Sequence, residues 1–288
     1  MNKLCLCLAL FAGTAAASGT TIDPSQPYAY AANAGWVNAY ADGTNGAVIG
    51  QSFCSGYLYG ANLGWITLGD GAPDNGYAYG NADGADAGVN HDGAGQLRGL
   101  AWSANAGWLT FEDTGNPRVD LATGELSGFA WGANLGWISL SGVRTTVLRA
   151  GEDSDGDGIP DPWEMRRAGS LRVLSGGGHD SDRDGFSDAA EYGADTDPLD
   201  GASLLAFTAF ERLGTTNSLT WTIRPTRFYD LWQTTTLGAG AAWSQSALGV
   251  MSPDAGSTMT REVSSSSPVG PPPAAQFYRV RAVIPLGE

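Results

Sequence analysis

Basic residues are scarce in this chain of 288 residues, which has 15 Lys and Arg against 30 Asp and Glu and a formal charge of −15 at pH 7. Lys3 is the single lysine. A nucleic-acid-binding protein needs a basic surface that displaces counterions from phosphates, and anionic membranes attract basic segments. We therefore expect no nucleic acid and no anionic membrane surface among the partners.

Cysteine is also rare, with three residues in the chain. Two of them, Cys5 and Cys7, lie in an N-terminal segment where Lys3 precedes the apolar run 4–12 and small residues follow at Ala15 and Ala17. That pattern is typical of a secretory signal peptide, here residues 1–17. We expect a protein secreted to the extracellular space, the cell surface or the periplasm, with no membrane insertion after signal cleavage. The mature chain keeps Cys54 alone and can form no internal disulfide.

The motifs of common enzymes are missing as well. The sequence contains no phosphate-binding loop, no nucleophile elbow and no His-Glu zinc motif. Cys54 is expected to be a small buried apolar group, His91 a turn residue, and His179 a loop neighbour of Asp180. Nearly half of the carboxylates lie in one segment described below, so we expect that the protein is not an enzyme.

What the chain has in abundance is glycine, 42 residues, and a repeat built on Asn-x-Gly-Trp. Four copies lie between residues 28 and 140, with their tryptophans at Trp36, Trp65, Trp108 and Trp137. The spacings of these tryptophans are 29, 43 and 29 residues, and Ala and Leu alternate after the Asn, so a unit of 72 residues is duplicated. Asn and Gly tolerate the positive φ of a hairpin connection, which predicts strand, tight turn and strand in each copy.

Two interpretations of the repeated aromatics stay open. We expect one Trp per copy to pack in the core while the Asn closes a turn, because a periodic aromatic in a β repeat is first a packing device. The alternative is a carbohydrate-binding face, since exposed Trp and Tyr offer flat apolar surfaces with a polar edge. A further strand upstream of each copy, as at 118–121 and 126–128, would make a three-stranded meander. The repeat resembles aromatic repeats of secreted bacterial proteins, a likeness that implies no activity.

The segment 152–200 holds 14 acidic residues and four Arg. Two stretches in it share the spacing of a twelve-residue calcium loop, which places carboxylates at positions 1, 3, 5 and 9, Gly at 6, a backbone carbonyl at 7 and Glu at 12. The predicted ligands are Asp153, Asp155, Asp157, Ile159, Asp161 and Glu164 in the first loop, and Asp180, Asp182, Asp184, Phe186, Asp188 and Glu191 in the second. Asp195, Asp197 and Asp200 are weaker candidates. Mg²⁺ rarely fills such an all-protein oxygen site, so the predicted cofactor is Ca²⁺.

These loops resemble the aspartate-rich calcium repeats of thrombospondin type 3 and the dockerin-like loops of secreted bacterial modular proteins, over residues 153–200. No entering helix precedes either loop, whereas short helical stretches follow at 163–168 and 189–193. This departs from the helix–loop–helix of an EF-hand, and indicates an EF-hand-like static site rather than a sensor that opens.

Residues 203–288 alternate apolar and polar side chains between turn clusters, which predicts a small β-sandwich of six or seven strands. The stretch 276–281 resembles the final strand of fibronectin-like or immunoglobulin-like modules. The fold class expected is mainly β: a repeat-built antiparallel domain at 18–150, a short calcium-loop segment at 151–202 and a C-terminal sandwich at 203–288.

The sequence thus predicts a secreted, calcium-binding structural or adhesive protein of the cell surface or extracellular matrix. A surface protein or a polysaccharide would be its partner. The alternative is a lectin-like protein that binds carbohydrate through the repeated Trp and Asn residues.

Overall fold

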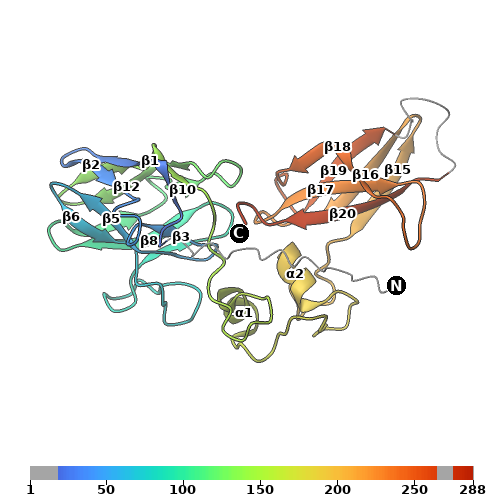
Figure 1. The fold of residues 1–288 in the computed structure, drawn as a ribbon, viewed down its shortest axis with the longest axis horizontal. Helices are drawn as coiled ribbons and strands as arrows, with labels where there is room; N and C mark the ends of the chain where they lie inside the picture. The colour runs from blue at the N-terminus through green and yellow to red at the C-terminus, as the bar shows by residue number, and fades with distance from the viewer. Residues whose placement is uncertain (1–18, 265–274, 288) are drawn as a thin grey trace, which may run out of the picture.

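The structure is a computed structural model that describes residues 19–264 and 275–287. The predicted signal peptide lies outside the described residues, as does most of the turn cluster expected between Ser264 and Pro273. The protein is mainly β, with 41% strand and 6% helix, as the sequence predicts. Figure 1 shows a barrel at one side, a second group of strands at the other and a helical segment below them.

Eight antiparallel strands close into a barrel, in the order β13-β12-β9-β8-β6-β5-β2-β1, with β1 paired to β13. Each copy of the sequence repeat forms one hairpin of this barrel. The strands are β1 (Ile22–Ala31), β2 (Gly35–Asn38), β5 (Tyr57–Gly60), β6 (Gly64–Thr67), β8 (Leu97–Ser103), β9 (Gly107–Phe111), β12 (Phe129–Gly132) and β13 (Gly136–Ser139).

The repeat's glycine makes the hairpin turn possible. Gly35, Gly64, Gly107 and Gly136 have φ values of 85°, 74°, 80° and 69°, a region that a residue with a Cβ rarely adopts. Each follows a β-turn that is closed by a backbone hydrogen bond, such as that from Leu135 N–H to the Gly132 carbonyl (3.1 Å). This is the three-residue hairpin connection with a glycine in the left-handed region.

The repeat's asparagine joins one hairpin to the previous one. The side-chain amide of Asn62 donates to the carbonyl of Ala34 (3.0 Å), that of Asn105 to Leu63 (2.9 Å) and that of Asn134 to Ala106 (3.0 Å). The amide nitrogen of Asn33 lies 3.3 Å from where a Cβ of Gly136 would stand, so Asn33 is next to the fourth hairpin. The Asn was expected to close its own turn; instead it links neighbouring turns at one end of the barrel.

Small and branched side chains fill the barrel interior. Val37, Ile66, Leu109 and Ile138 point inward and are at most 4% exposed, together with alanines such as Ala29 and Ala130. Because a barrel of eight strands is just wide enough for side chains to fill it, the narrow interior takes the Ala and aliphatic face of each strand. The aromatic face of each strand is turned outward, so the expectation that one Trp per copy packs in the core is wrong.

Short strands lie beside the eight strands of the barrel. Two of them pair with barrel strands, β7 (Val89–His91) with β8 and β14 (Val143–Thr145) with β1. The others form two separate ladders, β3 (Val48–Ile49) with β4 (Cys54–Ser55) and β10 (Arg118–Val119) with β11 (Leu126–Ser127). The strands expected upstream of the fourth copy therefore pair with each other. They form a separate ladder rather than the third strand of a meander, because both neighbours of β12 in the barrel are already taken by β9 and β13.

The acidic segment contains two helices, α1 (Asp161–Ala168) and α2 (Asp188–Ala194). Both begin at the ninth position of a predicted calcium loop, and both include the helical stretches expected from the sequence. Pro162 and two acidic residues favour the start of α1, because proline needs no N–H partner there and carboxylates stabilise a helix N-terminus. Gly169 then ends α1 in the left-handed conformation, with φ of 68°.

Six strands form two three-stranded antiparallel sheets in the C-terminal part, β15-β16-β19 and β18-β17-β20. Residues of both sheets share one core, including Leu219, Trp221, Tyr229, Leu231 and Met259. The strands are β15 (Phe207–Leu213), β16 (Thr216–Thr222), β17 (Phe228–Thr234), β18 (Ser244–Met251), β19 (Thr258–Ser264) and β20 (Phe277–Val283).

The last described residues return to the barrel. The N–H of Leu148 donates to the carbonyl of Leu286 (2.8 Å), and the Leu286 side chain packs against the barrel core. In Figure 1 the C-terminal end accordingly lies between the two groups of strands. The C-terminal part thus contacts the barrel directly as well as being linked to it through the helical segment.

Candidate metal centre

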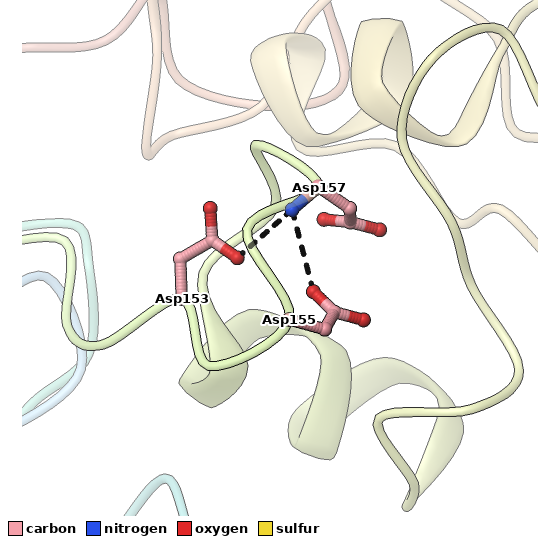
Figure 2. Close-up of side chains that lie close together, drawn as sticks. All are labelled: Asp153, Asp155 and Asp157. Atoms are coloured by element: carbon pink, nitrogen blue, oxygen red, sulfur yellow. Dashed lines mark hydrogen bonds between the residues drawn. The ribbon is translucent and has the colours of Figure 1, made fainter.

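The first acidic loop gathers three carboxylates. One oxygen each of Asp153, Asp155 and Asp157 lies within 4.8 Å of the other two (Figure 2). The loop is held in shape by its own backbone, because Asp153 accepts hydrogen bonds from the N–H groups of Gly156 (2.8 Å) and Gly158 (3.0 Å). Gly158, at the sixth position, has φ of 94° and makes the sharp turn that the spacing predicts.

Glu164 reaches this loop from the first turn of α1. Its side chain is fully buried, and neither carboxylate oxygen has a hydrogen-bond partner among the described residues. Burial, and then the charges of Asp157 and Asp155, raise the pKa of Glu164 to about 7. A buried carboxylate without a donor is costly, and a cation held between it and the three aspartates would relieve both the missing contacts and the repulsion.

The second loop repeats this arrangement. Asp180, Asp182 and Asp184 gather one oxygen each within 4.8 Å of one another, and Asp180 accepts from the N–H of Gly185 (3.0 Å). One oxygen of Asp182 and one of Asp184 are buried without a partner among the described residues. Glu191 accepts from the Thr196 hydroxyl (3.0 Å) with one oxygen, while its other oxygen is unpartnered in the same sense. Burial is the main cause that raises the pKa of Glu191 to about 7.

The aspartates at the ninth position brace their loops. Asp161 accepts from the backbone N–H of Ser154 (2.8 Å), and Asp188 from that of Ser181 (2.9 Å). Burial alone would raise the pKa of Asp188, but hydrogen bonds from His179 and Ser181 hold it below its usual value. His179 is thus a loop neighbour, as expected. Both aspartates, like Glu164 and Glu191, lie outside the two clusters of three carboxylates, and their role as ligands stays a prediction.

The residues at the seventh position support the loops through their backbone. Ile159 N–H donates to Asp157 (2.8 Å), and Phe186 N–H donates to Asp184 (2.7 Å). Ile159 is fully buried with Trp163 and Leu174 in a small core between the loops, whereas Phe186 is exposed. Coordination by the carbonyls of Ile159 and Phe186 stays a prediction.

Asp195, expected as an additional ligand, has a different role. It accepts hydrogen bonds from Trp163 Nε1 (2.8 Å) and Thr226 Oγ1 (2.5 Å), and forms ion pairs with Arg166 (3.1 Å) and Arg167 (2.9 Å). Burial alone would raise the pKa of Asp195, but Arg227 and these partners hold it below its usual value. Side chains of the protein itself supply the hydrogen bonds and ion pairs that Asp195 accepts. Asp195 therefore connects α1, α2 and the C-terminal sheets, and this connection is called here the Asp195 joint.

This joint could not be predicted from the sequence, because the residues that contact Asp195 are spread over more than 60 positions and follow no motif. Arg227 adds to it by donating to the carbonyls of Tyr192 (2.7 Å) and Gly193 (2.9 Å), at the C-terminal end of α2. The remaining candidates, Asp197 and Asp200, accept from the N–H groups of Leu199 (3.2 Å) and Ala202 (3.1 Å), in local turns.

The four repeat tryptophans lie on the outer surface of the barrel, far more exposed than core residues: Trp36 by 65%, Trp65 by 46%, Trp108 by 41% and Trp137 by 44%. In every hairpin the tryptophan contacts an aromatic ring of the partner strand, as Trp65 does with Tyr59 at 5.0 Å between ring centroids. Eleven exposed aromatic side chains make up this surface, called here the aromatic belt: Tyr28, Tyr30, Trp36, Tyr57, Tyr59, Trp65, Trp102, Trp108, Phe129, Trp131 and Trp137.

Cys54 and His91 are both engaged in packing. The Cys54 thiol is fully buried, as expected, and burial raises its pKa to about 12. His91 lies in β7 and is 3% exposed, so its expected position in a turn is wrong. Its Nδ1 lies 2.7 Å from the carbonyl of Gly50 and its Nε2 accepts from Gly95 N–H (3.1 Å), which occupies both ring nitrogens.

A scan against protein-family models, a search of the curated proteins and a search of the solved structures each found no match. Within residues 19–264 and 275–287, neither helix has the length and apolar character needed to cross a membrane.

Proposed function

We propose that this chain is a secreted calcium-binding structural or adhesive protein, in which two Ca²⁺ ions stiffen the segment between two β units. The observation that carries this proposal is Glu164, whose two oxygens are buried without donors among the described residues and close enough to the clustered aspartates for their charges to raise its pKa. The second loop repeats the same features around Glu191. The likeness to thrombospondin type 3 and dockerin-like loops supports the same assignment.

The donor set favours calcium over other cations. Each loop offers carboxylate oxygens and no cysteine, and the hard oxygen ligands of proteins suit Ca²⁺ or Mg²⁺. Five carboxylates per loop can supply the six to eight oxygens of calcium, especially with a bidentate Glu at position 12. Mg²⁺ retains several waters and seldom accepts so many protein oxygens.

The ion would act on the joint through neighbouring residues. Glu164 follows Trp163, whose indole N–H holds Asp195, and Asp195 holds Thr226 of the C-terminal part. A calcium ion that fixes Glu164 therefore fixes the first turn of α1 and the joint beyond it. With no disulfide available to a secreted chain that keeps only Cys54, calcium supplies the cross-link between loop and helix.

Isothermal titration of Ca²⁺ into chelated protein tests this proposal. We expect two ions to bind, and the Glu164→Gln variant to bind one of them at least about tenfold more weakly because it loses a charged ligand. Glu152→Gln, at an exposed carboxylate next to the loop, is the matched control and should bind both ions normally. Absence of binding at millimolar Ca²⁺, or equal loss in both variants, would overturn the proposal.

A second candidate function is favoured by the aromatic belt. Large aromatic side chains are seldom left in water without a partner, and eleven of them share one outer surface here. Carbohydrate binding would use such flat rings. A glycan array with Trp36, Trp65, Trp108 and Trp137 each changed to Ala tests it: loss of binding with an unchanged melting temperature supports a lectin, and unchanged binding in all four contradicts it.

A further inference from the structure

One hollow in the outer wall of the barrel combines aromatic rings with hydrogen-bonding groups. It lies between β9 and β12 and has a volume of about 320 Å³. Its lining is formed by Thr110, Glu112, Thr114, Gly115, Phe129, Trp131 and Trp137. The size falls in the range of small-ligand pockets, which take an apolar contact surface and a few polar groups that set orientation.

The first half of the barrel, which is the other copy of the duplicated unit, has different residues at the equivalent positions. A shift of 72 residues relates Glu112 to Tyr40, and Gly115 to Gly43. The Tyr40 ring lies over Gly43, 3.0 Å from where a Cβ would stand, and packs against the barrel core. Glu112 is exposed, whereas Tyr40 is half-buried. The two halves therefore share the aromatic rings but differ in the residues beside them, with an exposed carboxylate in the second half where the first half has a packed ring.

The chemistry of the hollow fits a sugar ring. Phe129, Trp131 and Trp137 are each exposed by 41–46%, and Phe129 meets Trp137 edge to face at 6.1 Å between centroids. A pyranose has an apolar C–H face that packs on an aromatic ring and hydroxyls around its rim that need partners. The hydroxyls of Thr110 and Thr114 and the carboxylate of Glu112 offer such partners next to the rings.

The negative charge around the hollow favours a neutral sugar over an acidic one. Glu112 is the charged side chain of the lining, and no basic side chain is among the residues that form it. The nearby Arg98 is paired with Asp113. A sulfated or uronic-acid chain would meet a carboxylate and a protein of net charge −15. An anionic lipid surface would be repelled in the same way.

We propose that the hollow between β9 and β12 binds a neutral pyranose unit of a polysaccharide, with Trp131 and Trp137 as stacking surfaces and Glu112 as a hydroxyl acceptor. This proposal rests on the carbohydrate-binding candidate and locates it at one place of the aromatic belt. The first half, which has Tyr40 at the position of Glu112, then serves as an internal control.

Calorimetric titration with cellohexaose, mannohexaose, xylohexaose and, as the anionic comparison, dextran sulfate tests the proposal in the calcium-loaded protein. We expect at least one neutral oligosaccharide to bind and dextran sulfate not to bind. Trp131→Ala should weaken binding about tenfold or more. Tyr59→Ala, its equivalent in the first half, should change binding less than about twofold. Melting temperatures of both variants establish that they fold.

Glu112→Tyr gives a second variant that transplants the first half's side chain and should abolish binding without unfolding the barrel. If no neutral oligosaccharide binds, or dextran sulfate binds instead, both this proposal and the neutral-carbohydrate function fail. If neutral sugars bind but Tyr59→Ala weakens binding as much as Trp131→Ala, or Glu112→Tyr leaves it intact, the location is wrong while the carbohydrate function stands.

Discussion

The barrel and the acidic segment are stabilised in opposite ways. The barrel buries a continuous core of aliphatic side chains, and its asparagines join the hairpins at one end. The acidic segment has a small hydrophobic cluster of three buried residues, Ile159, Trp163 and Leu174, and carboxylate oxygens that lack partners among the described residues. Hydrophobic burial stabilises the first region, whereas in the proposed function a bound ion completes the second.

Removal of calcium should therefore destabilise the acidic segment far more than the barrel, and this effect on stability should be the largest. At about 100 times its dissociation constant, each ion stabilises the bound state by about 2.7 kcal/mol, roughly 5 kcal/mol for two. Hydrogen exchange in the presence of a chelator should speed up throughout 153–196 and remain slow in β8 and β9. Equal loss of protection in both regions would contradict the contrast.

The joint at Asp195 should give the next largest effect. Asp195→Asn leaves Arg166, Arg167 and Arg227 without their buried counter-charge and should cost about 3 kcal/mol of unfolding free energy. Asp200→Asn, in an exposed turn, is the control. Because the pKa of Asp195 lies below 3.8 in the folded state, its stabilisation is present above that pH and is lost as the pH falls through the lower folded value. Denaturant titrations at pH 7 and pH 3 should show the difference between wild type and Asp195→Asn shrinking.

Neighbouring residues on opposite faces of β6 sharpen the comparison within the barrel. Ile66→Ala opens a cavity in the interior and should cost about 3 kcal/mol. Trp65→Ala removes an exposed ring that contacts Tyr59 and should cost about 1 kcal/mol. Thermal denaturation of the two variants measures this. A greater loss of stability in Trp65→Ala than in Ile66→Ala would indicate that the exposed aromatic side chains serve mainly in packing.

The hydrogen bonds from the repeat asparagines to neighbouring hairpins should have the smallest effect on stability. Asn134→Ala deletes the hydrogen bond to the Ala106 carbonyl, which water can replace in part, so we expect a loss of about 1 kcal/mol. Asn45→Ala, which removes an exposed hydrogen bond to Asp42, is a control for general effects of losing an amide. Asn134→Ala should lower the melting temperature more than Asn45→Ala does. The same small shift in both variants would mean that the hydrogen bonds between hairpins add no stability.

Local patterns predicted the elements of the fold and the positions of the clustered carboxylates. Gly136 marked a hairpin because few residues adopt the backbone that this position requires, whereas Asn134 has no positive φ and acts through its side chain. The spacing from Asp153 to Asp157 set which oxygens could meet. Alternation at Trp137 and Ile138 defined two faces but not which one points inward. That choice depends on closure of eight strands around a narrow interior, which no single strand encodes. Asp195 was misassigned for a similar reason, since Thr226 and Arg227 reach it from another part of the chain.

The contact between Leu148 and Leu286 changes what a cut in the acidic segment would do. Because the C-terminal part also touches the barrel here, the intact chain closes a loop, and its covalent link keeps the two units at a high effective concentration for each other. A protease that cleaves the acidic segment would remove that link, and non-covalent contacts alone would then hold the two fragments together. One cut in the connector would therefore make the attachment of the C-terminal part depend on the concentration of the protein.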